Sequence, residues 1–476
     1  MSGQTPTTFR EIDEMTSMRG GARWTSARAI MVLVASACQP GERAPERGDT
    51  TAAVRGAGDT SAACPSDNGG ITLPAGFCAT VFADTVGHAR HMVVAPNGIV
   101  YVNTWSGRYY GNAPAPRGGF LVALRDTTGD GVADLRMRFG DSVRSGGIGG
   151  TGIALHDGDL FVETNDKIVR YDLPADAVIP NASPTTVVSG LPLTGDHPAH
   201  PIAIDSSGAL FVNSGSASNA CGVRDRTPGS RGHDPCTELR TRAGIWRYDA
   251  NRTAQRFSAA ERFATGIRNA IGITIGPSGA LYATQHGRDQ LTESWPALYT
   301  AEQGQNLPAE ALLRVEEGGD YGWPYCYYDD TKRQLVLAPE YGGNGTDVGR
   351  CASMGAPTAT FPAHWAPNAV VFYSGSQFPA RYRGGAFIAF HGSWNRAPGP
   401  QGGYNVAFVP FSGANASGAF ETFADGFAGA EKSPDRAAHR PSGLAVGPDG
   451  SLYISDDKAG RIWRVVYRGA PGAARR

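Results

Sequence analysis

The sequence predicts an all-β protein, a six-bladed β-propeller of four-stranded antiparallel blades over residues 64–467. Two observations carry this prediction: a composition rich in turn-forming residues, and a short repeat that recurs six times. The 476 residues include 64 Gly and 32 Pro, and only 18% are charged. Such a composition is typical of many short strands joined by tight turns, and it argues against a helical bundle.

The repeat is a turn followed by a short apolar strand that contains a Tyr or Phe. One apolar run precedes each copy and another follows it, so each unit offers three short strands. Strands joined in this way form an antiparallel meander, and six such units form a propeller. The six copies lie at residues 96–102, 157–162, 207–212, 278–283, 384–389 and 449–454.

The spacing of the repeats is uneven, which predicts long insertions. Segments 213–243, 285–310 and 325–368 are expected to be inserted loops of the fourth and fifth blades, where functional residues usually lie. The last unit ends at Tyr467, so we expect ring closure to pair strands from both ends of the domain. A pair of β-sandwiches is the alternative fold, and six similar units argue against it.

The first 38 residues resemble a secretory signal. Three Arg residues precede a short apolar run over residues 29–37, and small residues precede Cys38 as in a bacterial lipobox. The run is too short to span a bilayer. We expect export to the periplasm or the cell envelope with Cys38 as a lipid anchor, and an ordinary cleaved signal is the alternative. Residues 39–63 are expected to be a flexible linker, and residues 468–476 a disordered tail.

The remaining cysteines also favour export. An even number of cysteines in sequence-local pairs fits three disulfides in an oxidising compartment. The alternative, a set of metal thiolates, lacks any Cys-x-x-Cys spacing. The expected pairs are Cys64 with Cys78, Cys221 with Cys236, and Cys326 with Cys351.

The charge balance limits the possible partners. The formal net charge is −1, which offers no basic field for nucleic acid or anionic lipid. We therefore expect no nucleic-acid partner, and no membrane contact other than the anchor at Cys38.

Residues 126–134 read Asp-Thr-Thr-Gly-Asp-Gly-Val-Ala-Asp and resemble the first nine positions of a calcium-binding loop. Met137 stands where an EF-hand has its Glu, so an EF-hand is excluded and we expect a structural calcium between strands. A solvated acidic turn is the alternative. The candidate ligands are Asp126, Thr128, Asp130, the main-chain carbonyl of Val132, and Asp134.

Several ordered segments carry a family resemblance. Residues 266–287 begin Gly-Ile-Arg-Asn and end Gln-His-Gly, and Gly-Gly-Asp-Tyr-Gly-Trp-Pro follows at 318–324. Residues 194–204 contain an Asp-His pair, and Gly-Ser-Ala-Ser-Asn-Ala-Cys follows at 215–221. Residues 439–450 supply a final-blade Arg motif. Together these segments resemble the sugar dehydrogenases that depend on pyrroloquinoline quinone (PQQ), the glucose/sorbosone dehydrogenase family.

The resemblance implies roles for the matched residues. His197 is the expected base for the proton of the sugar hydroxyl, and Asp196 beside it tunes its basicity. Arg268 and Asn269 are expected to bind PQQ through a guanidinium fork and an amide.

Other positions depart from the glucose dehydrogenase pattern. Gly287 and Arg288 stand at the positions where, in the family, two main-chain carbonyls bind the cofactor calcium. Arg288 replaces a Pro of the glucose dehydrogenases. Arg440 matches one of two arginines that bind PQQ, whereas Ser442 replaces the second. Arg396 is the candidate to replace the family's cofactor Lys. These departures favour a sorbosone-type branch over a true glucose dehydrogenase.

The expected function is oxidation of an aldose or related sugar by His-assisted hydride transfer to a calcium-bound quinone. PQQ and Ca²⁺ are the expected cofactors, and a periplasmic protein or molecule is the expected electron acceptor. One alternative is a metal-dependent, lactonase-like propeller hydrolase, which needs carboxylates that converge near the axis. The other is a non-catalytic binding propeller on the cell surface, which the missing second Arg favours.

Overall fold

The computed structural model describes residues 65–106, 116–142, 149–174 and 177–469. These residues form six sheets built on four antiparallel strands each, together with two short hairpins. The prediction of an all-β, six-bladed propeller is therefore confirmed. The signal-like segment 1–38, the linker 39–63 and tail residues 470–476 lie outside the described residues. In the described ranges, no helix has the length and apolar character needed to cross a membrane.

Each of blades one to five is a meander whose consecutive strands run from the inner to the outer edge. Blades one and two contain β2 (Ala89–Val94), β3 (Val100–Thr104), β4 (Leu121–Arg125) and β5 (Leu135–Phe139), then β6 (Gly149–His156), β7 (Asp159–Thr164), β8 (Lys167–Asp172) and β9 (Thr185–Ser189), with the short β13 (Gln255–Arg256) parallel to β9. Blades three and four contain β10 (Ile202–Ile204), β11 (Ala209–Ser214), β12 (Gly244–Asp249) and β14 (Arg262–Thr265), then β15 (Ile273–Ile275), β16 (Leu281–Gln285), β17 (Glu310–Val315) and β20 (Ala359–Phe361). Blade five contains β21 (Pro367–Phe372), β22 (Ala386–Phe390), β23 (Asn405–Val409) and β26 (Glu421–Ala424).

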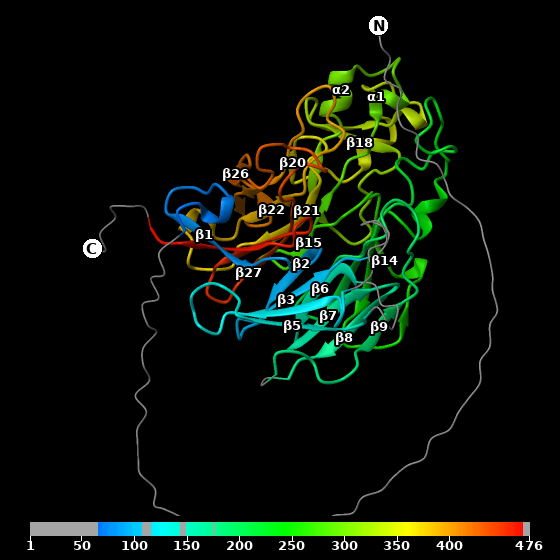
Figure 1. Cartoon of the computed structure of the whole chain (residues 1–476). Coiled ribbons are helices and arrows are strands. Elements are labelled where there is room, and N and C mark those ends of the chain that lie inside the picture. The colour runs from blue at the N-terminus through cyan, green and yellow to red at the C-terminus, as the bar shows by residue number, and fades with distance from the viewer. Residues whose placement is uncertain (1–64, 107–115, 143–148, 175–176, 470–476) are drawn as a thin grey trace, which may run out of the picture. The chain divides into compact units, whose positions relative to one another are not determined.

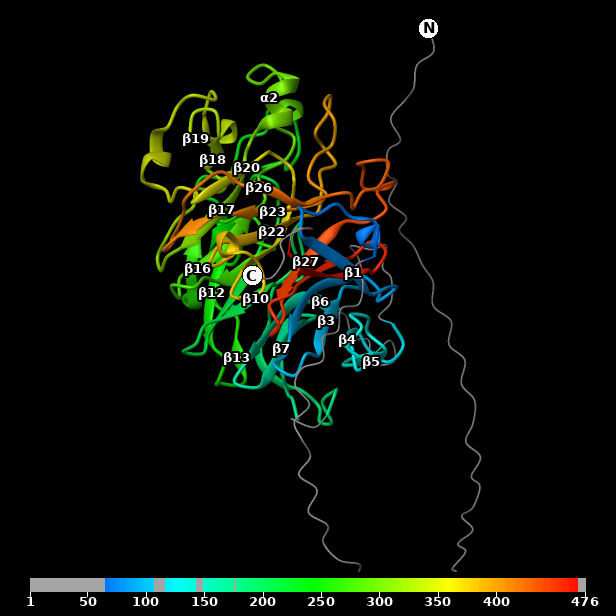
Figure 2. The same cartoon turned by 90° about the vertical axis from the view of Figure 1, so that its left-hand side faces the viewer.

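Blade six closes the ring with strands from both ends of the described chain. It contains β27 (Pro441–Val446), β28 (Leu452–Asp456), β29 (Ile462–Tyr467) and, as its outer strand, β1 (Phe77–Ala83). Phe77 pairs with Tyr467 at the start of this antiparallel register, and the blue β1 lies against the red and orange strands of the last blade (Figure 1, Figure 2). The inner strands β2, β6, β10, β15, β21 and β27 contact one another in this order, and β27 contacts β2. The predicted closure is thus confirmed.

The local sequence explains why the strands turn where they do. Between β6 and β7, His156 pairs with Asp159, which leaves Asp157 and Gly158 as a two-residue loop. Both loop residues have positive φ, 48° and 86°. An Asp-Gly loop with two positive φ values matches the twist of antiparallel strands, and Gly adopts such a φ without the steric cost of a side chain.

The long insertions lie in the predicted segments but belong to blades three and four. Segment 213–243 joins β11 to β12, and segment 285–310 joins β16 to β17. The third insertion precedes β20, which is the outer strand of blade four, so the expected assignment to blade five was wrong. The short helices and hairpin strands are η1 (Asn68–Gly70), η4 (Thr237–Arg240), η5 (Ala259–Glu261), α1 (Leu291–Ser294), α2 (Ala301–Asn306), β18 (Cys326–Asp329), β19 (Gln334–Leu337), η6 (Pro339–Tyr341), η7 (Gly349–Ser353), η8 (Ala380–Tyr382), β24 (Phe411–Ser412) and β25 (Asn415–Ala416).

Two disulfides stabilise these insertions. Cys221 is bonded to Cys236, and Cys326 is bonded to Cys351, as the sequence predicts. All four cysteines are buried in one apolar cluster with Trp323. Cys78 is also disulfide-bonded, and its expected partner, Cys64, lies outside the described residues.

Closure also depends on aromatic packing, which gives a first prediction. The Phe77 ring on β1 lies 4.7 Å from Phe378 and 5.1 Å from Phe423, centroid to centroid, so blade six is packed against blade five. We expect Phe77→Ala to lower the free energy of unfolding by about 3–5 kcal/mol, because it removes buried apolar surface and leaves a cavity. Chemical denaturation measures this, with exposed Val132→Ala as the control. Equal stability of the two variants would show that closure does not rest on this ring.

Candidate active site

One cavity of about 570 Å³ opens where loops and strand ends from all six repeats meet. It brings together six of the residues singled out in the sequence. They come from segments far apart in the chain, so only the closed ring makes them neighbours. The six are Asp196, His197, Arg268, Asn269, Gly287 and Arg440.

The hydrogen bonds of His197 fix its tautomer. Its Nδ1 lies 3.0 Å from the carbonyl oxygen of Ser216 and 2.9 Å from the Oγ of the same residue. That Oγ donates to the carbonyl of Ser218 at 2.7 Å, so it can only accept from the imidazole. Nδ1 therefore carries the hydrogen, and the lone pair of Nε2 is unused by the described residues.

The charge state of His197 follows from its surroundings. Burial, and then the nearby Arg268 guanidinium, hold the pKa of His197 well below its usual value of 6.5. At neutral pH the imidazole is uncharged, with a free lone pair in the cavity wall. It can accept a proton there.

The carboxylate that acts on His197 is Asp289 and not Asp196. Asp196 is exposed, and its carboxylate pairs with Arg226 at 2.7 Å. Asp289 is the acidic group that raises the pKa of His197. Burial acts to raise the pKa of Asp289 itself, but Arg268 and Arg226 lower it to about 2. The predicted tuning role of Asp196 is therefore not supported by the geometry.

The hydrogen-bond donors of the Arg268 guanidinium are used by groups of the protein itself. Its Nε donates to the Asn219 carbonyl at 3.1 Å, Nη1 donates to the Gly287 carbonyl at 2.9 Å, and Nη2 lies 3.0 Å from Asp289. Nη2 also donates to the Asn219 side chain. The guanidinium thus organises the cavity wall rather than presenting an open fork to a ligand.

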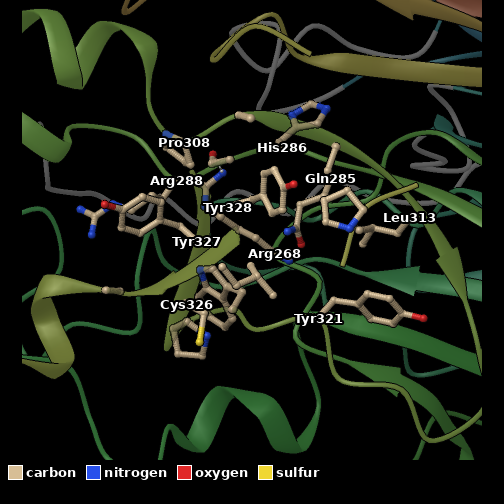
Figure 3. A pocket seen from close by; sticks show the side chains of 18 of the residues that line it. Arg268, Gln285, His286, Arg288, Pro308, Leu313, Tyr321, Cys326, Tyr327 and Tyr328 are labelled. Atoms are coloured by element: carbon tan, nitrogen blue, oxygen red, sulfur yellow. Dashed lines mark hydrogen bonds between the residues drawn. The ribbon is translucent and has the colours of Figure 1, made fainter. Parts of the chain in front are cut away.

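Gly287 and Arg288, the predicted calcium pair, both line a second cavity of about 30 Å³, and only Gly287 also lines the large cavity. The buried Arg288 side chain pairs with Glu340 at 2.5 Å. Figure 3 shows this smaller space between Arg268, Arg288 and the ring of Tyr327. It has room for about one water molecule.

Unpaired polar groups mark the part of the cavity that could hold a ligand. The Oδ1 atoms of Asn269 and Asn395 are buried and have no hydrogen-bond partner among the residues that the structure describes. Arg440 donates from Nε to the His391 carbonyl and from Nη2 to the Gly392 carbonyl, both at 2.9 Å, which leaves Nη1 available. Buried amides without partners are costly unless a ligand satisfies them.

Arg396, the candidate replacement for a cofactor lysine, does not line the cavity. Its guanidinium donates to the carbonyls of Gln305 and Ala363 at 3.1 and 2.8 Å, and to the Asn306 side chain at 3.1 Å. Ser442 is buried on β27, and its Oγ has no hydrogen-bond partner in the described part of the chain. The cofactor role predicted for Arg396 therefore has no support from its position.

The predicted calcium loop closes on itself. The Asp126 carboxylate accepts from the N–H groups of Gly129 and Gly131, and the Asp130 carboxylate accepts from the N–H of Val132 at 2.9 Å. Thr128 Oγ1 lies 3.3 Å from Asp126, and the N–H of Thr127 donates to Asp134. Nowhere in the described ranges do three His, Cys, Asp or Glu side chains converge to hold a metal. A structural calcium at this loop stays a prediction, as does the solvated acidic turn that is its alternative.

Several cavity residues carry no clear signal in the sequence. Asp289 lies two residues past segment 266–287, and this closeness was the one signal in the sequence that could have pointed to it. His391 Nε2 lies 2.7 Å from Asp457, whose other oxygen lies 2.6 Å from Arg90. These partners come from blades five, six and one, so their contact depends on ring closure.

Glu310 is another acidic group of the cavity wall. Burial raises its pKa from 4.5 to about 8, although the N–H groups of Gly287 and Ala366 bond to it and act in the opposite direction. The charge of Asp289 raises this pKa further. Glu310 is therefore protonated at neutral pH.

This protonation predicts a pH-dependent stability. Between pH 4.5 and 8 the unfolded carboxyl is ionised while the folded one keeps its proton, so unfolding releases a proton. Stability must then fall as the pH rises through this window, by an amount on the order of a few kcal/mol. Unfolding free energies measured across the window should fall less steeply for Glu310→Gln than for the parent. Parallel curves would show that Glu310 is already ionised in the folded state.

Two curated relatives match about two fifths of the chain. An uncharacterised protein of Borreliella burgdorferi is 29% identical over 210 residues, 44% of this chain and 49% of the relative. A pyrroloquinoline quinone-dependent pyranose dehydrogenase of Coprinopsis cinerea is 27% identical over 248 residues, 43% of this chain and 31% of that protein. The chain thus spans half or less of the length of these relatives. The second match confirms the predicted resemblance to PQQ-dependent sugar dehydrogenases.

Solved structures share the propeller. The Trichoderma reesei enzyme of the carbohydrate-active family AA12 has a TM-score of 0.66 at 19% identity, covering 84% of this chain and 98% of that one. The holo PQQ domain of Coprinopsis cinerea pyranose dehydrogenase has a TM-score of 0.64 at 19% identity, covering 83% and 97%. A family model described as TrAA12-like matches residues 71–468, which is most of the chain, and the chain belongs to this TrAA12-like family.

Proposed function

We propose that the protein is an oxidoreductase that oxidises an aldose or related sugar with PQQ as its cofactor. One observation carries the proposal: an uncharged His197 with an unused Nε2 lines the same cavity as Arg440 and the unpaired amide of Asn269. The named relatives, a PQQ-dependent pyranose dehydrogenase among them, support it.

The free polar groups of the cavity fit this cofactor. PQQ is a tricarboxylate quinone, so its site must offer cations and hydrogen-bond donors. Among the described residues, Nη1 of Arg440 makes no hydrogen bond and can donate to a carboxylate of PQQ, whereas the unpaired Oδ1 of Asn269 can only accept a hydrogen bond from a ligand. For a cofactor calcium, the Gly287 carbonyl stays a predicted ligand, and in this structure it accepts a hydrogen bond from Arg268. The Arg288 carbonyl remains a predicted ligand.

The division of chemistry follows from these groups. When bound, the quinone would supply the acceptor for a hydride, that is, one proton with two electrons, which no amino acid side chain provides. Nε2 of His197 takes the proton of the sugar hydroxyl, and its low pKa keeps it ready to do so at neutral pH. Ser216 holds the ring through Nδ1 and so keeps the accepting nitrogen constant.

We also propose that the protein is exported and passes its electrons to a periplasmic acceptor. Buried disulfides that stabilise the insertions support an oxidising compartment. Lipidation of Cys38, which lies outside the described residues, stays a prediction, as does membership of a sorbosone-type branch. The lactonase-like alternative needs converging metal-binding carboxylates, and the described residues contain no such group.

Replacement of the base tests the assignment directly. We expect His197→Ala to lower sugar turnover by about 10²- to 10⁴-fold, because a positioned base contributes that much. PQQ affinity, measured by absorbance titration, should stay close to the parent value. The exposed His233→Ala is the matched control, since it removes an imidazole elsewhere. Equal loss of turnover and of PQQ affinity would contradict the assignment of His197 as base.

A second comparison identifies the carboxylate that acts on His197. Asp289 raises the pKa of His197, so Asp289→Asn should move the acid limb of kcat/KM to lower pH. Asp196→Asn should leave that limb in place, because the Asp196 carboxylate forms an ion pair with Arg226. The measurement is the pH profile of kcat/KM for dye reduction. The opposite pattern would restore the role that the sequence assigns to Asp196.

A further inference from the structure

An exposed indole lies at the mouth of the cavity. Trp394 is 55% exposed although it lines the cavity, and Leu193, which is 49% exposed, lines it too. Six large hydrophobic side chains are exposed among the described residues, and two of them, Trp394 and Leu193, line this one cavity. Single exposed hydrophobic side chains are ordinary, but a group at a cavity mouth indicates a binding surface.

The loop that carries Trp394 is held on both sides of it. On one side, Ser393 donates its N–H to the Gly402 carbonyl at 2.9 Å and accepts from the Tyr404 hydroxyl at 2.7 Å. On the other side, the Asn395 amide donates to Asp289 at 2.9 Å. The residues on both sides of Trp394 are therefore held by hydrogen bonds, while its ring stays open to solvent.

Arg396 completes this arrangement. Its Nη1 donates to the carbonyls of Gln305 and Ala363, and its Nη2 donates to the Asn306 side chain, so the guanidinium ties the loop to these groups. These acceptors belong to the blade-four insertion and to the segment before β21, so one side chain joins three stretches of chain. The rigid fork of Arg suits such bridging better than the flexible ammonium of Lys.

We propose that Trp394, with Leu193 beside the base segment, is the platform for the apolar face of the sugar ring, and that Arg396 is a positioning residue that acts through Trp394. A pyranose has a face of C–H groups, which packs on an aromatic π-system, and an edge of hydroxyls. Asn395 has an unpaired Oδ1 next to the platform and can accept from such a hydroxyl. Arg440 and Asn269 belong to the cofactor's part of the cavity. The substrate class rests on the proposed function.

Sugar binding can be measured without turnover. The ligand is 1,5-anhydro-D-glucitol, which lacks the anomeric hydroxyl, and its affinity is measured by calorimetry on the full chain with and without PQQ. We expect Trp394→Ala to weaken binding about tenfold, the usual scale for loss of one well-packed aromatic contact. Trp394→Phe should retain most of the affinity. Exposed Leu298→Ala, outside the cavity, should change nothing.

Turnover gives the second readout. With an oxidisable aldose, Trp394→Ala should raise KM by a similar factor while kcat and the PQQ dissociation constant stay near the parent values. Arg396→Ala should raise KM as well, but should add nothing when Trp394 is already Ala, because it acts through the indole. Additive effects, or weaker PQQ binding in Arg396→Ala, would overturn the positioning role.

The two proposals fail in different ways. If the parent binds PQQ and Trp394→Ala binds the sugar as well as the parent does, the platform is wrong and the proposed function stands. If the parent binds no PQQ, the proposed function is wrong. Sugar binding by the parent and by Trp394→Ala, measured by calorimetry without cofactor, then tests the platform. A parent that binds no sugar under either condition overturns the platform.

Discussion

The cavity depends on one buried cation. Arg268 lies beneath the surface with its guanidinium bonded to Asn219, Gly287 and Asp289, groups from the insertions of blades three and four. A buried charge is tolerated only when its partners satisfy it, and removal of one partner typically costs about 3–5 kcal/mol. This cation lowers the pKa of His197 and keeps Asp289 ionised. The same contact therefore fixes the shape of the wall and the protonation state of the base.

The insertions are rigid because covalent and apolar contacts support the polar ones. The Asn219 carbonyl accepts from Arg268 and also from the indole of Trp323 at 3.0 Å. Trp323 lies in the cluster that contains both disulfides of the insertions. Long loops often carry function on a rigid scaffold, and here the loops have a small core of their own. The polar network can then hold its geometry outside the blades.

The fold could be predicted from the sequence because each repeat contains residue patterns that indicate its own strands. Turn residues, a short apolar run and a Tyr or Phe within it mark the central strand of each blade, and these are local signals. The meeting of His197 and Arg268 in one cavity also followed from the matched segments. What could not be predicted was the choice of partner. Asp196 is adjacent to His197 in sequence, yet it turns to Arg226, and Asp289 acts on His197 instead.

Arg396 and the acidic loop at 126–134 show the same limit. A guanidinium or a carboxylate indicates binding of an opposite charge, but each can also be satisfied by main-chain carbonyls or N–H groups. Arg396 bonds to two carbonyls, and the Asp126 carboxylate bonds to two N–H groups. Which outcome occurs depends on how the surrounding loops fold, and no residue pattern in these segments encodes that path.

The pairing of β1 with β29 affects how the protein folds. The two strands are separated by nearly the whole domain, so a large entropy of loop closure must be overcome before their contact stabilises anything. Until then, blade six has an open sheet edge that invites pairing with another chain. Closure of the propeller ring is therefore expected to be slow and highly cooperative. Aggregation competes with the step in which β1 pairs with β29.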